Sequence, residues 1–420
     1  MRISLISLFI LIGTVLLGQS DNPFLNRAYW KENPSIEQVA EEIEKGNDPS
    51  EFNEYKFDAV TWAIIQRVSH QTIWFLLDQE GNGVNKRSHD GRTPIFWAAY
   101  RGDVQFMKEL IEKGAKTDLI DDHGYSLVNF AATTGQLNLD LYDLCIENGA
   151  KLETEKNRDG ATPLLLLIPH LKDPKKIKYF EEKGLSLNQL DKFGNNAFVY
   201  AAKTGNKKLM EYLIKYGIDP KINNSAAVIF ACKGTRGTTN SVETYQYLKS
   251  LGLSMTETDS KGKTALHYLS SNCEDIDVFN FFIKHGVQLS EKDKKGNMPF
   301  LNAVSRNSRE IVQFLAENTK NINGKNNKSE NALHLAVKRN NLDILEILLS
   351  QNIDINAKNE NGLTPLHLAA MTAKDDSIIK KLVEAGADKQ LLTPFEETAF
   401  DLANENELLT QERISLDFLK

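Results

Sequence analysis

Short apolar stripes with helical spacing recur along the chain, separated by turns rich in Gly, Asn and Asp. In one stripe, Ile344, Ile347 and Leu348 are spaced so that they fall on one face of a helix. A shorter apolar segment with a small Ala-Ala pair, as at 98–99, precedes such stripes in the clearest copies. The pattern predicts pairs of short helices. Because one stripe stays unburied within a pair, successive pairs are expected to stack on each other.

A first series of glycines marks the expected end of the second helix in each pair. Its members are Gly46, Gly81, Gly114, Gly149, Gly184, Gly217, Gly252, Gly286, Asn318, Asn352 and Gly386, with steps of 32 to 35 residues. Glycine adopts the left-handed conformation that closes a helix without strain, and asparagine tolerates it. We therefore expect a left-handed backbone at every position of the series, Asn318 and Asn352 included.

A second series of glycines opens the next unit about ten residues later. Its members are Gly91, Gly124, Gly160, Gly194, Gly262, Gly296 and Gly362. Two units lack this glycine, and there Asn224 and Ser329 are expected to take its place. The two series together describe one unit that is repeated along the chain, rather than two or three separate globular domains.

The segment after the opening glycine carries the most specific motif. Residues 91–99 read GRTPIFWAA and residues 362–370 read GLTPLHLAA. Thr is expected to cap the first helix, and Pro fits its first position because the missing N–H would be unpaired there anyway. This motif resembles the ankyrin-repeat signature G-x-T-P-L-H-x-A-A. The resemblance implies an all-α ankyrin-repeat solenoid of about 10–11 helix–turn–helix units, joined by β-turn or hairpin loops.

The repeat register divides the chain into segments. We expect a signal peptide over 1–20, an N-terminal capping half-repeat over 21–50, ankyrin repeats over 51–389 and a C-terminal capping repeat over 390–420. Terminal units of a solenoid need a polar outer face, as the segment from Thr393 onwards has.

One unit is longer than the others between its Ala pair and its closing glycine. From Ala231 to Gly252 there are 21 residues, whereas from Ala98 to Gly114 there are 16. The five additional residues predict a flexible loop over 233–241.

The N-terminus combines Arg2, an apolar run over 3–17 and the small residues of Gly18-Gln19-Ser20. This arrangement is typical of a secretory signal, which implies export to the periplasm or the medium. The signal and the Lys-, Asn- and Ile-rich composition favour a bacterial source. An uncleaved N-terminal anchor is the alternative, although the run is shorter than the roughly 20 apolar residues of a spanning helix. After cleavage we expect no stable membrane span.

Composition narrows the classes of ligand. The chain has 50 Lys and Arg against 57 Asp and Glu, a formal net charge of −7, which argues against nucleic acid as a partner. Its three cysteines, Cys145, Cys232 and Cys273, are too few and odd in number for a disulfide framework. No C-x-x-C pair starts a metal site, so we expect no metal and no cofactor.

The histidines do not form a catalytic pattern. His267, His334 and His367 all occupy the fourth letter of T-P-L-H, and the resemblance implies that they hydrogen-bond within and between neighbouring repeats. No G-x-S-x-G or H-E-x-x-H motif is present. We therefore predict that the protein is not an enzyme.

The resemblance implies that residues flanking each opening glycine, and those after the Ala pair, are free of packing contacts and line one concave groove. Carried over by position, the candidate partner-binding residues are His89, Asp90, Arg92, Tyr100, Arg101, His123, Tyr125, Phe193, Lys203, Lys261 and Lys294. Aromatic residues and Arg are common interface anchors, so the first half is expected to anchor a partner. The Lys-rich later part is expected to steer an acidic one. That these are merely solvated turn residues is the alternative.

We therefore predict a monomeric, non-enzymatic scaffold for protein–protein interaction. Two other functions stay open from the sequence: a secreted effector or immunity-type inhibitor of another protein, and a periplasmic module that binds a small molecule or glycan.

Overall fold

A computed structural model describes residues 22–235, 238–411 and 414–420. In these ranges the chain forms helices and turns and no β-strand, which confirms the all-α prediction. The expected signal peptide over 1–20 lies outside them. The described residues divide into two compact units, which end and begin at Arg158 and Asp159. We call them unit 1 and unit 2 and describe each by itself.

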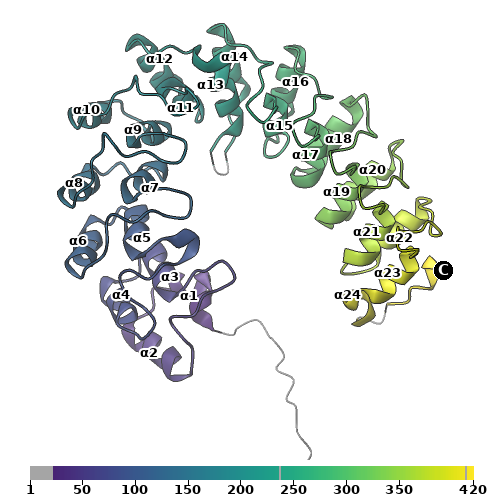
Figure 1. The fold of residues 1–420 in the computed structure, drawn as a ribbon, viewed down its shortest axis with the longest axis horizontal. Helices are drawn as coiled ribbons and strands as arrows, with labels where there is room; N and C mark the ends of the chain where they lie inside the picture. Colours follow the sequence, from purple (N-terminus) through teal and green to yellow (C-terminus); the bar gives the residue numbers. More distant parts are fainter. Residues whose placement is uncertain (1–21, 236–237, 412–413) are drawn as a thin grey trace, which may run out of the picture. The chain divides into compact units, whose positions relative to one another are not determined.

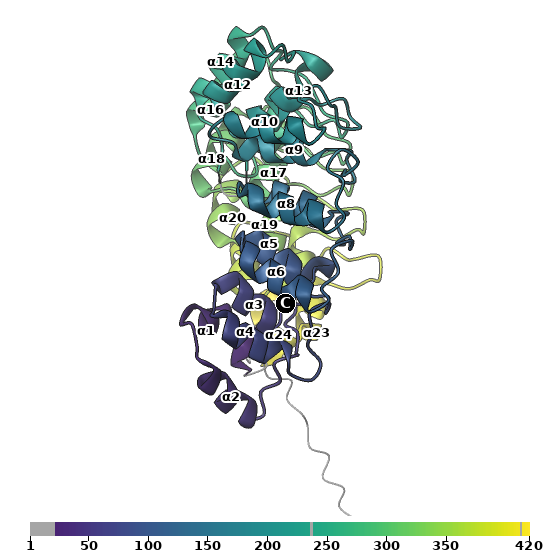
Figure 2. The same ribbon diagram turned by 90° about the vertical axis from the view of Figure 1, so that its left-hand side faces the viewer.

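Unit 1 contains three complete helix pairs after an N-terminal segment of short helices. Its elements are η1 (Pro23–Leu25), α1 (Arg27–Lys31), α2 (Ile36–Glu44), α3 (Ala59–Gln66), α4 (His70–Leu77), η2 (His89–Gly91), α5 (Pro94–Arg101), α6 (Val104–Glu112), α7 (Leu127–Thr133) and α8 (Leu139–Glu147). The first helices of the pairs, α3, α5 and α7, stack in one row (Figure 1). The second helices, α4, α6 and α8, form another row, and Figure 2 turns α6 and α8 toward the viewer.

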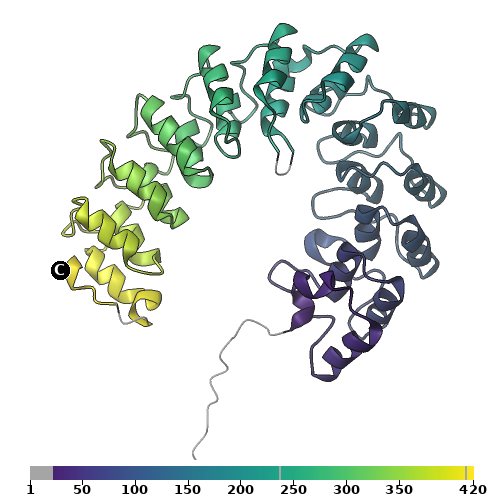
Figure 3. The same cartoon turned by 180° about the vertical axis from the view of Figure 1, so that it is seen from behind.

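Unit 2 continues the same alternation. Its elements are α9 (Pro163–Leu167), η3 (Ile168–His170), α10 (Lys175–Glu182), α11 (Ala197–Ala202), α12 (Lys207–Lys215), α13 (Ile222–Lys233), α14 (Val242–Ser250), α15 (Ala265–Leu269), α16 (Ile276–Lys284), α17 (Pro299–Arg306), α18 (Arg309–Asn318), α19 (Ala332–Arg339), α20 (Leu342–Leu349), α21 (Pro365–Thr372), α22 (Ser377–Glu384), α23 (Ala399–Glu405), α24 (Glu407–Gln411) and η4 (Asp417–Leu419). The odd-numbered helices from α9 to α23 form the first row and the even-numbered helices the second, as labelled in Figure 1, and Figure 3 shows the ribbon from behind.

The Thr-Pro pairs begin first-row helices as expected. Proline is the first residue of α5, α9 and α21, each time after a threonine, and of α17, where it follows Met298. The predicted cap is not formed at α5, because the buried hydroxyl of Thr93 has no hydrogen-bond partner among the described residues. The hydroxyl oxygen of Thr162 accepts a hydrogen bond from the backbone N–H of Leu165, and that of Thr364 accepts one from His367. Each bond pairs one of the N–H groups that a helix start leaves open.

The T-P-L-H histidines join neighbouring repeats. In His267, Nδ1 accepts the N–H of Thr264 at 3.1 Å, and Nε2 donates to the carbonyl oxygen of Asn297 in the next turn at 2.9 Å. His334 and His367 make the equivalent bond with Nε2. Burial lowers the pKa of all three imidazoles, which favours the neutral form that these bonds require. Their predicted structural role is confirmed.

The closing glycines have positive φ, for example +88° at Gly114. The prediction that Asn318 and Asn352 share this conformation is wrong, because neither has a positive φ. Asn318 is the last residue of α18, where its side-chain Nδ2 donates to the carbonyl oxygen of Phe314, and extended Thr319 ends the helix. After α20, the N–H of Ile353 instead donates to the carbonyl of Gln351.

Among the opening positions, Ser329 replaces glycine as predicted, with a φ of +55°. Asn224 was expected at the equivalent place, but the left-handed residue is Asn223, one position earlier. The side-chain Nδ2 of Asn223 donates to the carbonyl of Phe193 and to Oδ1 of Asn195, both at 2.8 Å, and so ties this turn to the preceding one.

A side-chain bond that the sequence analysis did not anticipate shapes these turns. Oδ1 of Asp121 accepts the N–H groups of His123 and Tyr125, at 3.0 and 2.8 Å. Six further turns repeat the arrangement, at Asn53, Asp191, Asp259, Asp293, Asn326 and Asn359. Neighbouring turns are joined by backbone bonds such as that from Asp122 N to Asp90 O, at 2.9 Å. The turns are therefore fixed and can present side chains at defined positions.

Candidate interaction surface

The structure places the predicted partner-binding residues on turns and at the ends of first-row helices. His89, Asp90, Arg92, Tyr100, Arg101, His123 and Tyr125 belong to unit 1, and Phe193, Lys203, Lys261 and Lys294 belong to unit 2. The unit 1 residues are brought together on two successive turns and on the helix α5 between them, so they form one surface. We call it the unit 1 surface.

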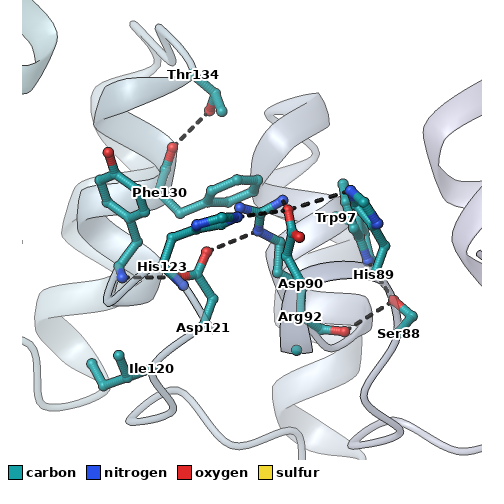
Figure 4. Close-up of polar contacts among 12 residues, drawn as sticks. Ser88, His89, Asp90, Arg92, Trp97, Ile120, Asp121, His123, Phe130 and Thr134 are labelled. Atoms are coloured by element: carbon teal, nitrogen blue, oxygen red, sulfur yellow. Dashed lines mark hydrogen bonds and ion pairs between the residues drawn. The ribbon is translucent and has the colours of Figure 1, made fainter. Parts of the chain in front are cut away.

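Arg92 lies at the centre of the unit 1 surface (Figure 4). Its Nε is 2.9 Å from Oδ2 of Asp121, and its Nη1 is 3.0 Å from Oδ2 of Asp90. Its guanidinium also lies 4.3 Å from the ring centroid of Phe130 and 5.4 Å from that of Trp97. Two ion pairs and two cation–π contacts therefore hold one side chain in place.

The position of Arg92 in the repeat suggests a residue that is free of packing contacts. The structure shows that this prediction is wrong. The residue is only 9% exposed, and Asp121 beside it is buried. The reason is that the guanidinium reaches across to the next turn, where Asp121 needs a counter-charge inside the protein. Arg92 thus stabilises the stack and positions its neighbours.

Two histidines converge on the remaining carboxylate of this cluster. Nε2 of His89 is 3.3 Å and Nε2 of His123 is 3.2 Å from Oδ2 of Asp90. The side chain of His123 is 57% exposed, whereas His89 is covered on one face by Phe57, with ring centroids 4.3 Å apart. Asp90 therefore organises the turn tips, and His123 is the member of the group that solvent or a partner reaches.

Aromatic rings extend the unit 1 surface on both sides. Phe57 stacks between His89 and Trp62, at 4.3 Å from each ring centroid. Tyr100 packs edge-on against Trp97 and remains 38% exposed. The rings form a continuous apolar strip with polar atoms at its edges.

Tyr55 is an exposed member of this surface that sequence reasoning missed. It is 61% exposed, and its backbone carbonyl pairs with Nδ1 of His89 at 2.7 Å. Its turn has no opening glycine, because Lys56 takes the left-handed conformation instead, with a φ of +60°. The signal that could have revealed it is the repeat period, since Lys56 precedes Gly91 by 91 − 56 = 35 residues.

Two other predicted residues of unit 1 are half-buried. Arg101 offers its backbone carbonyl to the Arg67 guanidinium at 3.0 Å, and burial together with the charge of Arg67 lowers the pKa of Arg101. Tyr125 donates its backbone N–H to Asp121. Both line the surface rather than project from it.

In unit 2 the predicted residues differ in exposure. Phe193 is 53% exposed at a turn tip, and Lys261 and Lys294 are exposed on later turns, joined by a backbone bond from Lys294 N to Lys261 O. Lys203 is half-buried at the end of α11, and burial lowers the pKa of its ammonium group. The structure thus gives this lysine a less hydrated environment than an exposed turn residue would have.

Within the described ranges, no group of three or more His, Cys, Asp or Glu side chains is arranged to hold a metal ion. The three cysteines are buried and unpaired, and burial raises the pKa of the Cys145 thiol to about 12. No helix among the described residues is long and apolar enough to cross a membrane.

Comparison with known proteins gives a consistent result. A family model for three consecutive ankyrin repeats matches residues 60–156, 229–326, 270–359 and 300–393, and a model for a single ankyrin repeat matches 193–222. Together these matches cover more than half of the chain.

Curated relatives share parts of the chain at low identity. The ankyrin repeat protein nuc-2 of Neurospora crassa is 27% identical over 148 residues, which cover 35% of this chain and 14% of that protein. A putative palmitoyltransferase ZDHHC13 of Danio rerio is 22% identical over 196 residues, or 45% of this chain and 29% of the relative. A putative ankyrin repeat protein of Rickettsia felis is 23% identical over 289 residues, or 56% and 75%. The chain spans less than a third of the length of the first two.

Proposed function

The chain belongs to the ankyrin-repeat family, and from this premise we propose that it is a non-enzymatic protein-interaction scaffold whose partner docks on the unit 1 surface. Ankyrin repeats are modules for protein–protein interaction, and the fold alone does not specify a partner. The choice of surface therefore rests on which side chains the turns and first-row helices present.

The observation that carries the proposal is the exposed aromatic edge of the unit 1 surface. Tyr55, Tyr100 and His123 all expose a substantial part of their side chains, while the rings beneath them are fixed by stacking and by the bonds around Arg92. Aromatic side chains on a rigid support lose little conformational entropy on binding and commonly provide hot spots. The unit 1 surface is thus suited to anchor a partner without rearrangement.

Catalysis is not part of the proposal. The palmitoyltransferase relative is matched over only 29% of its length, so the activity in its name belongs to that whole protein. In the described part of this chain the conspicuous polar cluster, around Arg92, consists of ion pairs that bind one another. A network whose charges are already paired holds the surface residues in place, and this supports binding as the function.

We further propose that the protein acts after export, into the periplasm or the medium, as a monomer. The apolar run over 3–17 behind Arg2 supports this part of the proposal. Fractionation of the native cells, with N-terminal sequencing of the recovered protein, tests it. Recovery from the cytoplasm with residues 1–20 retained would contradict export.

The docking proposal is tested by affinity capture from the native cell envelope, followed by quantitative mass spectrometry. A Tyr55→Ala/Tyr100→Ala/His123→Ala variant is compared with wild type and with Tyr216→Ala. Tyr216 is an exposed aromatic residue of unit 2 that follows the C-terminal end of the second-row helix α12. We expect the triple variant to recover the partner at least about tenfold less, because each anchor contributes on the order of 1–2 kcal/mol. Equal recovery by the triple variant and Tyr216→Ala would refute the docking site.

A further inference from the structure

Two lysines on the first-row side of unit 2 have no acidic partner. Lys203 follows α11, and Lys233 is the last residue of α13. Both are half-buried, and within the part of the chain that the structure describes neither ammonium group forms an ion pair or a hydrogen bond. An ammonium ion that has lost part of its water without gaining a carboxylate is destabilised, so these positions invite a counter-charge from outside.

Aromatic rings hold one of these ammonium groups without neutralising it. Nζ of Lys233 lies 4.9 Å from the ring centroid of Phe230 and 5.0 Å from that of Tyr268. Nζ of Lys263 lies 5.3 Å from the ring centroid of Tyr268. Cation–π contacts fix the positions of these charges and leave them available for an anion.

Two of the three carboxylates nearby are already occupied by the fold. Asp191 accepts the hydroxyl of Tyr200 at 3.0 Å in addition to its two backbone N–H groups. Asp259 accepts the hydroxyl of Tyr268 together with its own two turn N–H groups. Oδ1 of Asp293 holds its turn in the same way, whereas its buried Oδ2 has no hydrogen-bond partner among the described residues and lies 3.9 Å from Nζ of Lys263. These three carboxylates therefore shape the turns and only partly balance the lysines.

The electrostatic consequence is visible at Lys233. Burial lowers the pKa of its ammonium group, Asp259 partly offsets this effect, and the nearby charges of Lys261, Lys203 and Lys263 lower the pKa further. Three neighbouring lysines are thus close enough to Lys233 to disfavour its charged form. A bound anion would offset both the burial and this repulsion at Lys233.

We propose that Lys203, Lys233, Lys261 and Lys263, which we call the lysine row, bind an acidic peptide segment whose Asp and Glu carboxylates supply the missing counter-charges. The proposal rests on the proposed function only in that the segment belongs to a protein partner. Its members come from three successive repeats of unit 2, so an extended peptide with several acidic side chains can reach all of them. A small anion would engage only one or two.

Single-stranded nucleic acid fits the lysine row less well. Proteins that bind it offer free aromatic faces on which the bases stack. Here Tyr200 is buried, and the rings of Phe230 and Tyr268 are already in contact with Lys233. The aromatic groups of the lysine row therefore support its lysines and do not present a stacking platform.

The test uses the full chain and measures fluorescence anisotropy with labelled decaglutamate, decaglutamine and an oligothymidylate of the same length. Wild type is compared with Lys203→Met/Lys233→Met, which keeps the apolar stems. The matched control is Lys215→Met/Lys249→Met, which removes two exposed lysines from the second-row helices α12 and α14 of the same units. We expect wild type and control to bind decaglutamate with equal affinity, and the Lys203/Lys233 variant to bind at least about tenfold more weakly.

A readout on wild type guards against a folding defect in the variant. Decaglutamate should slow the reaction of Lys203 and Lys233 with an amine reagent, as measured by peptide mass spectrometry, because an ion-paired ammonium releases its proton less readily. Unchanged reaction rates, undetectable binding of decaglutamate or tighter binding of oligothymidylate would each overturn the proposal. Since no native partner is used, these outcomes do not depend on the unit 1 surface, whose own test is the capture experiment.

Discussion

Replacing Arg92 by Ala should destabilise unit 1 rather than simply remove a contact residue. The substitution leaves the buried Asp121 carboxylate without the Nε partner that is 2.9 Å away in wild type. Breaking a buried ion pair on one side costs about 3–5 kcal/mol. Losing the cation–π contact with Phe130, at 4.3 Å, adds about 1 kcal/mol. We therefore expect a loss of about 4 kcal/mol or more in the free energy of unfolding of unit 1.

Tryptophan fluorescence during urea unfolding measures this loss selectively. All four tryptophans, Trp30, Trp62, Trp74 and Trp97, lie in unit 1, so their emission reports that unit and not unit 2. We expect the fluorescence transition of Arg92→Ala to move to clearly lower urea. Far-ultraviolet circular dichroism should retain a second transition at the wild-type position, because it also records the helices of unit 2.

Two further variants separate the buried charge from other effects. Arg92→Met/Asp121→Asn removes both charges but keeps the Oδ1 acceptor that holds the turn, so it should regain most of the lost stability. Lys263→Ala removes the corresponding cation in unit 2, whose Nζ lies 3.9 Å from Oδ2 of the buried Asp293, and should cost less than Arg92→Ala because it breaks no hydrogen bond to that carboxylate. If the free energy of unfolding of Arg92→Ala were within about 0.5 kcal/mol of the wild-type value, the structural role of Arg92 would be refuted.

Three other predictions follow from buried or inserted groups. Burial holds the pKa of the three T-P-L-H histidines below the unfolded value of about 6.5. The stability that these histidines contribute is therefore fully present above that pH and is lost as the pH falls below it. The circular-dichroism melting temperature should therefore fall between about pH 7.5 and pH 5.5, and His334→Gln should reduce this fall. Neither polar atom of the buried Asn129 amide has a hydrogen-bond partner among the described residues, so Asn129→Leu should raise the free energy of unfolding by about 1 kcal/mol, and a decrease would contradict this. Limited proteolysis of the native protein should cut first within 233–241, and complete protection there would contradict the predicted flexible loop.

The sequence predicted the architecture because the residues that set it act locally. The Thr-Pro pairs start first-row helices, and glycine closes second-row helices in the left-handed conformation. Asn318 and Asn352 were mispredicted because asparagine only tolerates that conformation, and the helix ends differently where another bond is available. The displaced left-handed residue at Asn223 has a similar origin, since its side chain bonds to Phe193 in the preceding turn.

The candidate surface was only partly predictable, because the position of a residue in its repeat does not reveal its packing against the next repeat. Arg92 occupies a turn position that resembles a contact residue, yet Asp121 in the next turn draws it into the interior. Tyr55 was missed because its turn has no glycine to mark it. Lys233 was missed because its importance comes from Tyr268, 35 residues away in the sequence and 5.0 Å away in space.

Arg92 and Lys263 show why one repeat position has different consequences in the two units. Each directly precedes the threonine of its motif and faces an acidic turn residue of the next unit, Asp121 or Asp293. A planar guanidinium can bind two carboxylates and stack on rings at once, so the charge of Arg92 is paired within the fold. An ammonium group is a compact, well-hydrated charge, and Lys263 stays 3.9 Å from its carboxylate while resting on a ring. The exposed feature of unit 1 is therefore a set of aromatic edges, whereas in unit 2 the ammonium group of Lys263 stays partly exposed.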